Sequence, residues 1–286
     1  MKEKEPFKMS LKIASNIASQ AVQRNLKRVS DKSQLELERL SSGRRITKST
    51  DDAAGLAIGS KLESQTRGLK QAARNTNDGI SLVQTAEGGL NEISSILMRL
   101  RELTVQSASD TVADAERELL DMEYQQLLDE VDRISESTVF NGTHLLNGES
   151  GRGVLSFQVG TFDGDENRIE YDADDAEATT SAIGISGSEI SDIDGALDSM
   201  EEIDESIEEV SRLRARIGSV QTRLHSTVSN LEVQILNQDN ARSVIQDVDV
   251  AESTARLASL NVIKSAAVAS LVQANNLPNT ALRLIG

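Results

Sequence analysis

Apolar residues recur every three or four positions along three stretches of this sequence, and that spacing constrains the fold more than any other feature. In the stretch from Gly79 to Gln106, the core positions are Val83, Ala86, Leu90, Ile93, Leu97, Leu100 and Thr104. Such a heptad repeat is typical of a coiled coil, in which one narrow apolar stripe must be covered by partner helices. The pattern therefore predicts a helix that is stable only when it packs against others.

Two further stretches have the same spacing and supply partner helices. The shorter one has core positions Leu120, Tyr124, Leu127, Val131 and Ile134. The longer one has core positions Ala196, Met200, Ile203, Ile207, Val210, Arg214, Ile217, Gln221, Leu224, Val228, Leu231 and Ile235. A repeat of this length predicts a helix over 190–245, roughly 80 Å long at about 1.5 Å per residue. We expect the apolar members of these three sets to form the core of one bundle.

The composition favours long helices over a globular enzyme. Aromatic residues make up only 2% of the chain, and there is no Trp to fill a wide interior. The two prolines, Pro6 and Pro278, lie near the ends, so no proline interrupts the helices between them. The predicted fold is mainly α: a long, rod-shaped, antiparallel coiled-coil bundle formed by paired N- and C-terminal segments, with a small β-hairpin region in the middle.

Local signals divide the chain into five parts. A helix over 10–40 ends at Gly43, and a second begins after Asp51 and Asp52, whose carboxylates suit a helix N-terminus. We expect the second helix to reach about Ser107 and a third to cover 113–137. The predicted parts are an N-terminal helix over 1–48, bundle segments over 49–138 and 190–244, a β and acidic loop region over 139–189, and a C-terminal helix over 245–286.

The middle region has the character of short strands and loops. Asn141-Gly142 and Asn147-Gly148 are hairpin turn signals, and residues 154–159 and 167–171 alternate like strands. Residues 172–188 are predicted to form an acidic loop. Six glycines within the predicted helix over 51–107 suggest close packing of its backbone against neighbours; they are Gly55, Gly59, Gly68, Gly79, Gly88 and Gly89.

Charge and residue types exclude several classes of function. The net charge is −16, and 18 acidic residues against one base, Arg168, lie between Thr161 and Val210, so this segment would repel nucleic acid. With no Cys and only two histidines, His144 and His225, far apart in sequence, we expect no catalytic or metal site and no cofactor. Asp163, Asp165 and Asn167 begin like a calcium loop, but Arg168 stands where that loop needs glycine.

The two ends are the strongest candidates for a binding surface. Residues 10–23 contain one charge, Lys12, and residues 265–282 contain none, and both carry small or apolar residues around the whole helix. Helices of this kind are normally buried on several sides, so we expect the ends to pair and to be covered by other copies of the chain. The candidate self-association residues are Ala14, Ile17, Ala18, Ala21, Leu26, Leu257, Ala266, Ala269 and Val272.

We expect no run of residues to be long and apolar enough for a membrane span, and no secretory signal peptide is visible.

Several motifs, in order along both terminal regions, resemble those of bacterial flagellin. They lie at residues 40–46 (LSSGRRI), 51–57 (DDAAGLA), 74–80 (RNTNDGI), 86–93 (AEGGLNEI), 99–106 (RLRELTVQ), 140–143 (FNGT) and 273–278 (QANNLP). The resemblance implies a structural subunit that polymerises into the flagellar filament for motility, with the paired ends forming the inner tube. The alternatives are the hook-filament junction protein of the same family and a coiled-coil adaptor.

The resemblance also implies partners and a location. These are other copies of the chain, an export chaperone on the C-terminal helix, hook-junction and cap proteins, and export without a cleaved signal by the flagellar type III secretion system to an extracellular filament. Some flagellins are bound by a Toll-like receptor through a bundle face that here carries Arg99, Leu103 and Glu123. Contacts between subunits are an alternative role for these three residues.

Overall fold

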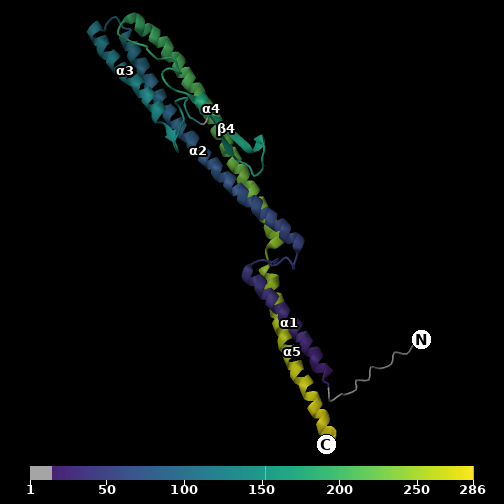
Figure 1. Ribbon diagram of the computed structural model, residues 1–286. Helices are drawn as coiled ribbons and strands as arrows, with labels where there is room; N and C mark the ends of the chain where they lie inside the picture. The colour runs from purple at the N-terminus through teal and green to yellow at the C-terminus, as the bar shows by residue number, and fades with distance from the viewer. Residues whose placement is uncertain (1–14, 152, 286) are drawn as a thin grey trace, which may run out of the picture. The chain divides into compact units, whose positions relative to one another are not determined.

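A computed structural model describes residues 15–151 and 153–285, and these residues are mainly helical (Figure 1). The long helices are α1 (Ile17–Ser42), α2 (Ala53–Ser107), α3 (Asp114–Ser137), α4 (Ile193–Gln246) and α5 (Val250–Ile285). The chain divides into two compact units, Met1–Glu63 with Asp239–Gly286 and Ser64–Gln238, and the boundaries fall within α2 and α4. The predicted division into five parts is finer than these two units and stays a prediction.

In the first unit, α1 and α5 lie side by side and antiparallel (Figure 1). The side-chain amide of Asn16 donates to the backbone carbonyl of Ala274 at one end of the pair. Further along, the hydroxyl of Ser253 donates to the Glu36 carboxylate. Helix α1 ends as predicted at Gly43, which has a positive φ of 69° and supplies the left-handed C-cap. Residues 10–14 of the predicted helix lie outside the described part of the chain.

Backbone hydrogen bonds and carboxylates close the turns of this unit. The amide of Arg45 donates to the carbonyl of Gln246 at 2.7 Å, so the segment after α1 pairs with the end of α4. Asp52 accepts from the amide of Gly55 at 2.9 Å, as expected for a carboxylate at a helix N-terminus. Helix α2 then runs without interruption to Ser107, which confirms the predicted helix despite its glycines.

The second unit is built on α2, α3 and α4 (Figure 1). All seven predicted core positions of α2 are completely buried, from Val83 to Thr104. The α4 repeat was predicted correctly at every seventh residue, because Ala196, Ile203, Val210, Ile217, Leu224 and Leu231 are all buried. The first four intermediate positions lie one residue earlier than predicted, whereas Val228 and Ile235 pack against the core as predicted. Arg214 is exposed, whereas Leu213 is buried.

Buried serines account for the first two of these shifts in α4. Ser199 and Ser206 occupy core positions next to the predicted Met200 and Ile207, which are only half-buried. Their hydroxyls donate to the backbone carbonyls of Glu189 at 3.0 Å and Ile183 at 2.7 Å. A search for apolar periodicity selects the larger side chains and passes over a serine that faces the backbone of another segment.

Helix α3 and its entry turn close the bundle. Its buried residues include Tyr124, Leu128 and Val131, so Leu128 lies deeper than the predicted Leu127, which packs at the edge of the core. Arg117 is also buried, and its guanidinium donates to the carbonyls of Ser107 and Ser109. The first bond satisfies the carbonyl of the last residue of α2, which has no partner within the helix, and the second ties down the turn that follows.

Two small antiparallel sheets follow α3. Strands β1 (Val139–Phe140) and β2 (Thr143–His144) are joined by the predicted two-residue turn, in which Asn141 and Gly142 both have positive φ. Strands β3 (Val154–Gln158) and β4 (Arg168–Asp172) form the second hairpin, as the alternation predicted. The prediction at Asn147-Gly148 is wrong, because these residues form a bend that joins no strands.

The predicted acidic loop over 172–188 is a loop after the end of β4, with one short 3₁₀ turn. Apolar residues of the segment over 173–190 nevertheless enter the core, where Ala178, Ile185 and Ile190 are completely buried. Helix α3 holds its backbone in place, since the carboxylates of Asp132 and Asp121 accept from the amides of Thr180 and Ile190. The segment therefore forms a strap across α3 and α4.

Candidate self-association surface

Large apolar side chains are exposed along both helices of the first unit. In α5, Val262 is 70% exposed and Val272 is 57% exposed, and in α1 Ile17 is 62% exposed. Among the described residues of this unit, the only buried hydrophobic side chains are Ile46 and Ala274. A pair of helices that leaves this much apolar surface in water needs a further partner.

The candidate self-association residues fall into three groups. Ala14 lies outside the described residues. Ile17, Ala18, Ala266, Ala269 and Val272 are exposed, whereas Ala21, Leu26 and Leu257 lie half-buried between the two helices. The five exposed residues are available to another molecule. The three half-buried residues contribute to the helix pair itself. Their role in self-association stays a prediction.

One expectation about α5 is corrected by the structure. The window Val250–Asn279 is long and apolar enough to cross a membrane by length and hydropathy, and only 6% of it is buried. No span is predicted from the sequence because the uncharged stretch from Ser265 to Leu282 is rich in Ala, Ser, Gln and Asn. One such helix is weak support for a membrane span, since a helix that packs against protein partners passes the same test.

A polar cluster fixes how α1 meets α5. The Glu36 side chain is buried, and its carboxylate accepts from the hydroxyl of Ser253 at 2.6 Å and from the guanidinium of Arg39 at 3.1 Å. Arg256 pairs with Glu252 one turn further along the same face of α5. A buried carboxylate with one satisfying partner on the facing helix disfavours other alignments of the two helices.

The residues that the resemblance linked to a receptor do not share one surface. Arg99 and Glu123 are exposed and form an ion pair at 2.8 Å, and their hydrogen bond raises the pKa of the Arg99 guanidinium. Leu103 is completely buried, so its side chain does not lie on the surface with theirs. Leu103 is buried because α3 and α4 both pack on α2 here, which makes the buried face wider than a two-helix stripe. The receptor contact of these three residues stays a prediction.

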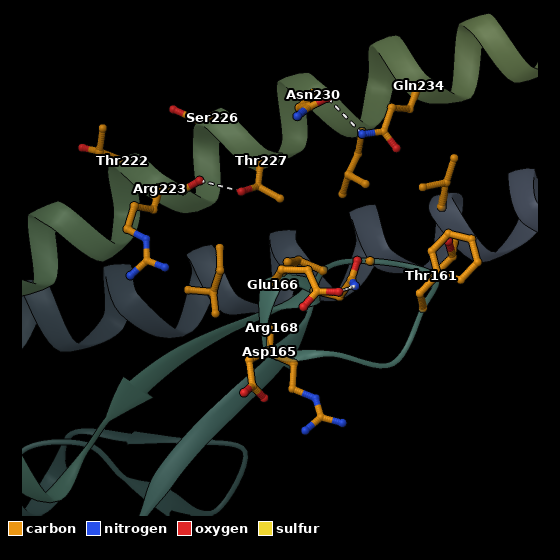
Figure 2. A pocket seen from close by; sticks show the side chains of 17 residues that line it. Thr161, Asp165, Glu166, Arg168, Thr222, Arg223, Ser226, Thr227, Asn230 and Gln234 are labelled. Atoms are coloured by element: carbon orange, nitrogen blue, oxygen red, sulfur yellow. Dashed lines mark hydrogen bonds between the residues drawn. The ribbon is translucent and has the colours of Figure 1, made fainter.

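The second unit also contains a groove of about 570 Å³ between α4 and the loop that joins β3 to β4. Figure 2 shows Thr222, Ser226, Thr227, Asn230 and Gln234 along one wall, and Asp165, Glu166 and Arg168 on the other. These side chains are hydroxyls, carboxamides and charges of both signs, and Leu69, Phe162 and Leu231 are among the apolar residues that also line the groove. No nucleophile is paired to a base. The groove has no arrangement that supports catalysis.

The described residues contain no group of three or more His, Cys, Asp or Glu side chains that could hold a metal ion. The Nδ1 atom of His144 lies 2.8 Å from the carbonyl of Glu136, and His225 is exposed on α4. The site that the structure offers is therefore a surface for protein contact, carried by exposed apolar helices.

Comparison with known proteins agrees with this description. A model of the bacterial flagellin N-terminal helical region matches residues 13–150, and a model of the bacterial flagellin C-terminal helical region matches residues 200–285. The unmatched stretch between them contains β3, β4 and the strap. Both long antiparallel helix pairs thus belong to the matched regions.

Relatives of similar length match almost the whole chain. A flagellin of Halalkalibacterium halodurans is 39% identical and a flagellin of Bacillus subtilis is 36% identical; each alignment covers 96% of this chain, and 99% and 100% of the respective relative. A structure assigned as a flagellar hook-associated protein from Vibrio parahaemolyticus is 16% identical, with a TM-score of 0.56 over 68% of this chain and 99% of that one, and shows the fold alone. The chain belongs to the bacterial flagellin family, whose members are non-enzymatic structural subunits of the flagellar filament.

Proposed function

We propose that this chain polymerises through its first unit, with α1 and α5 packing against the same helices of other copies. The observation that supports this is the exposed apolar surface of α5, where Val262 and Val272 have no cover in the single chain. Burying apolar area yields roughly 25 cal/mol per Å², so repeated contacts along these helices offset the entropy lost on assembly.

The same proposal includes partners that act before assembly. A subunit that polymerises through an exposed apolar helix needs that helix covered until it reaches the growing end. We therefore propose that an export chaperone covers α5, that the chain leaves the cell through the flagellar type III secretion system, and that hook-junction and cap proteins contact its ends. Receptor binding at Arg99 and Glu123 is a separate and weaker proposal, because Leu103 is buried.

The experiment uses the full chain and a variant with Val262→Asp and Val272→Asp. Both positions are exposed in the single chain, so the substitutions leave the monomer folded, as circular dichroism will check. We expect long uniform tubes from the unsubstituted protein in electron microscopy as its concentration is raised, and none from the variant. A charge at these positions would be buried without a partner in the filament.

Val154→Asp serves as the matched control. Val154 is a β3 valine that is 49% exposed and lies in the middle region, which is expected to face outward. This variant should form tubes like the unsubstituted protein. Tubes from the double α5 variant would overturn the proposed role of α5. Folded chains without tubes from any protein would instead favour the hook-filament junction protein or the coiled-coil adaptor.

A further inference from the structure

Strand β4 is paired along one edge only. It forms a two-stranded antiparallel sheet with β3, and no other strand joins this sheet in the described part of the chain. In such a pair, backbone hydrogen bonds form between every second pair of facing residues. The amide of Val159 donates to the carbonyl of Asn167 at 2.8 Å just beyond the strands, which sets the phase of this alternation. The backbone groups of Ile169 and Tyr171 therefore point toward β3.

The alternate residues of β4 turn their backbone groups away from β3. These residues are Arg168, Glu170 and Asp172. The Arg168 amide bonds to the carbonyl of Asp165 at the start of the strand. The Arg168 carbonyl, both backbone groups of Glu170 and the Asp172 amide have no hydrogen-bond partner among the described residues. An unpaired strand edge of this kind is a template for a further strand.

A groove runs along this free edge and separates it from α4. The groove of about 570 Å³ between α4 and the β3–β4 loop is lined by Arg168 and Ile169, and Figure 2 shows Arg168 across from the α4 side chains. A second hollow of about 320 Å³ is lined by the rest of the strand, Glu170–Asp172. Arg223 of α4 lines both hollows. Every residue of β4 therefore borders open space on the side of α4.

The wall that α4 forms is one flank of that helix. Its residues recur at intervals of three and four, which places them on one side of a helix. They are exposed, and they are Arg216, Ser219, Arg223, Ser226, Asn230 and Gln234. Ser219 and Ser226 have short side chains, so the flank leaves room for an extended chain beside β4. Its hydroxyl and carboxamide groups can bond to polar side chains of that chain.

The charges that line the groove are mostly negative. Arg168 and Arg216 each pair with an aspartate of the same chain. Among the described residues, Arg223 is the one lining base without an ion pair, whereas four lining carboxylates have none; these belong to Asp165, Glu166, Glu170 and Asp172. Uncompensated carboxylates beside a groove favour a positively charged occupant and repel an acidic one.

We propose that this groove binds an extended, basic segment of a partner protein, which adds to the free edge of β4 as a third strand. Main-chain hydrogen bonds to the free groups of Glu170 and Asp172 supply the affinity. The side chains of an added strand alternate between its two faces. One set lies beside the carboxylates of Glu170 and Asp172 and is basic. The other set rests on the α4 flank and is polar.

A second copy of this chain is a poor source for the added strand. Its β3 has no charged side chain, and its β4 would bring its own carboxylates against those of the first copy. The groove also lies wholly within the second unit, so this contact does not depend on polymerisation through α1 and α5. The occupant is therefore a segment of a different protein.

Binding of model peptides tests strand addition. The probe is a fluorescently labelled peptide of about seven residues in which lysine and threonine alternate, and anisotropy measures its binding to the full-length chain at physiological salt. Two further peptides are N-methylated, one at the lysines and the other at the threonines. Only every second amide of an added strand faces β4, so we expect one methylated peptide to bind within about twofold of the probe and the other at least about tenfold more weakly.

Three results of this experiment would overturn the proposal. The first is no binding of the unmodified probe. The second is equal binding by the two methylated peptides, because a contact made by charge alone does not distinguish them. The third is tighter binding by a peptide in which glutamate and threonine alternate, because the groove would then select an acidic partner.

Two proline variants identify the edge that is used. Glu170→Pro removes the amide on the free edge of β4, where proline is tolerated because no bond within the sheet is lost. Ser156→Pro is the matched control, since Ser156 faces Glu170 across the hairpin and its amide points to the opposite edge. We expect Glu170→Pro to weaken binding of the probe about tenfold and Ser156→Pro to leave it within about twofold. Circular dichroism checks that both variants fold, and equal affinities for the two folded variants contradict the proposal.

Amide hydrogen exchange in the unsubstituted chain tests the same contact without a variant. When the probe is bound, the amides of Glu170 and Asp172 should exchange at least about tenfold more slowly, because each gains a hydrogen-bond partner. The amide of Ser156 should exchange at an unchanged rate. Unchanged exchange at Glu170 and Asp172 with the probe bound, or slower exchange at Ser156 alone, means that the peptide binds elsewhere, and the proposal then fails.

Discussion

The two units are both built on a pair of long antiparallel helices, and they differ in what covers the pair. In the second unit, α3, the β3–β4 hairpin and the strap cover α2 and α4, so positions such as Leu90, Leu97 and Leu224 are completely out of water. In the first unit, nothing within the described chain covers α1 and α5, and Val262 stays 70% exposed. A heptad pattern thus determines which helices pair, while a third layer determines whether the pair is stable alone.

The buried polar groups of the first unit align its two helices without covering their apolar surface. The first unit buries Ser33, Glu36 and Ser253 between its helices, which aligns the pair but adds little apolar burial. Most of its apolar surface is available to other copies. We therefore expect the single chain to draw its stability from the second unit, with the first unit stabilised on assembly.

The largest expected effect is a difference in the free energy of unfolding between Leu97→Ala and Val262→Ala, each measured in the single chain. Leu97 is completely buried, so its truncation leaves a cavity and should lower the free energy of unfolding by about 3 to 5 kcal/mol. Val262→Ala should change it by less than about 0.5 kcal/mol, as is usual for exposed positions. Denaturant unfolding followed by circular dichroism measures both. A comparable loss from Val262→Ala would mean that α5 is already packed in the free chain.

The next effect concerns the buried charge of the second unit. Arg117 donates to the carbonyls of Ser107 and Ser109 and to the carboxylate of Asp114, at 2.9, 3.0 and 2.8 Å. Arg117→Ala leaves the Ser107 carbonyl without its donor, while the Ser109 carbonyl keeps the bond from the amide of Val112. The loss of the buried guanidinium and its bonds should cost about 3 kcal/mol in the same unfolding experiment. The first unit has no buried arginine of this kind among its described residues.

Arg133→Ala is the control for this prediction. Arg133 pairs with Glu130, but it lies on the exposed face of the same helix, where ion pairs contribute less than about 1 kcal/mol. If the two variants lower the free energy of unfolding by similar amounts, Arg117 stabilises the fold only through its charge and not through its bonds to the turn after α2.

Two buried tyrosines of the second unit should respond in opposite directions. The Tyr124 hydroxyl lies 2.7 Å from that of Ser188 in the strap, whereas the Tyr171 hydroxyl is buried and has no hydrogen-bond partner. Tyr124→Phe should lower the free energy of unfolding by about 1 kcal/mol, and Tyr171→Phe should leave it unchanged or raise it by up to about 1 kcal/mol. A loss from Tyr171→Phe as large as that from Tyr124→Phe would mean that the Tyr171 hydroxyl has found a partner in solution.

Periodicity predicted the parts of the fold in which apolar residues face one partner. Leu90, Leu97 and Leu224 were expected in the core and lie there, and the Asn141-Gly142 turn was read from its need for positive φ. Where two helices pack on different sides of one helix, the three-four spacing of apolar residues does not identify every buried position. Leu103 falls outside a two-helix stripe but is buried, because α2 contacts both α3 and α4.

Hydrogen bonds between residues far apart in sequence were the second reason why the fold differed from the prediction. The composition of residues 172–188 predicted an acidic loop, yet Ile185 in it is completely buried, because Asp132 and Ser206 bind the backbone of Thr180 and Ile183 just before it. Those partners lie 48 and 23 residues away in sequence, respectively. For the candidate surface, the uncharged ends predicted paired helices covered by other copies, but only the structure separates exposed Val272 from half-buried Leu257.

The smallest expected effect lies in the turn between α1 and α2, where the first unit depends on polar contacts. The backbone amide of Thr47 donates to the Asp51 carboxylate, and this bond holds the pKa of that carboxyl below its ordinary value of 3.8. The carboxylate therefore stabilises the folded turn fully above pH 3.8, and the contribution is lost as the pH falls through the lowered folded value. The amide resonances of Thr47 and Lys48 should titrate with a midpoint below 3.8 and should not do so in Asp51→Asn. Because Asp51 is solvent-accessible, the effect on overall stability is small; a midpoint at or above 3.8 would mean that the turn is open in the free chain.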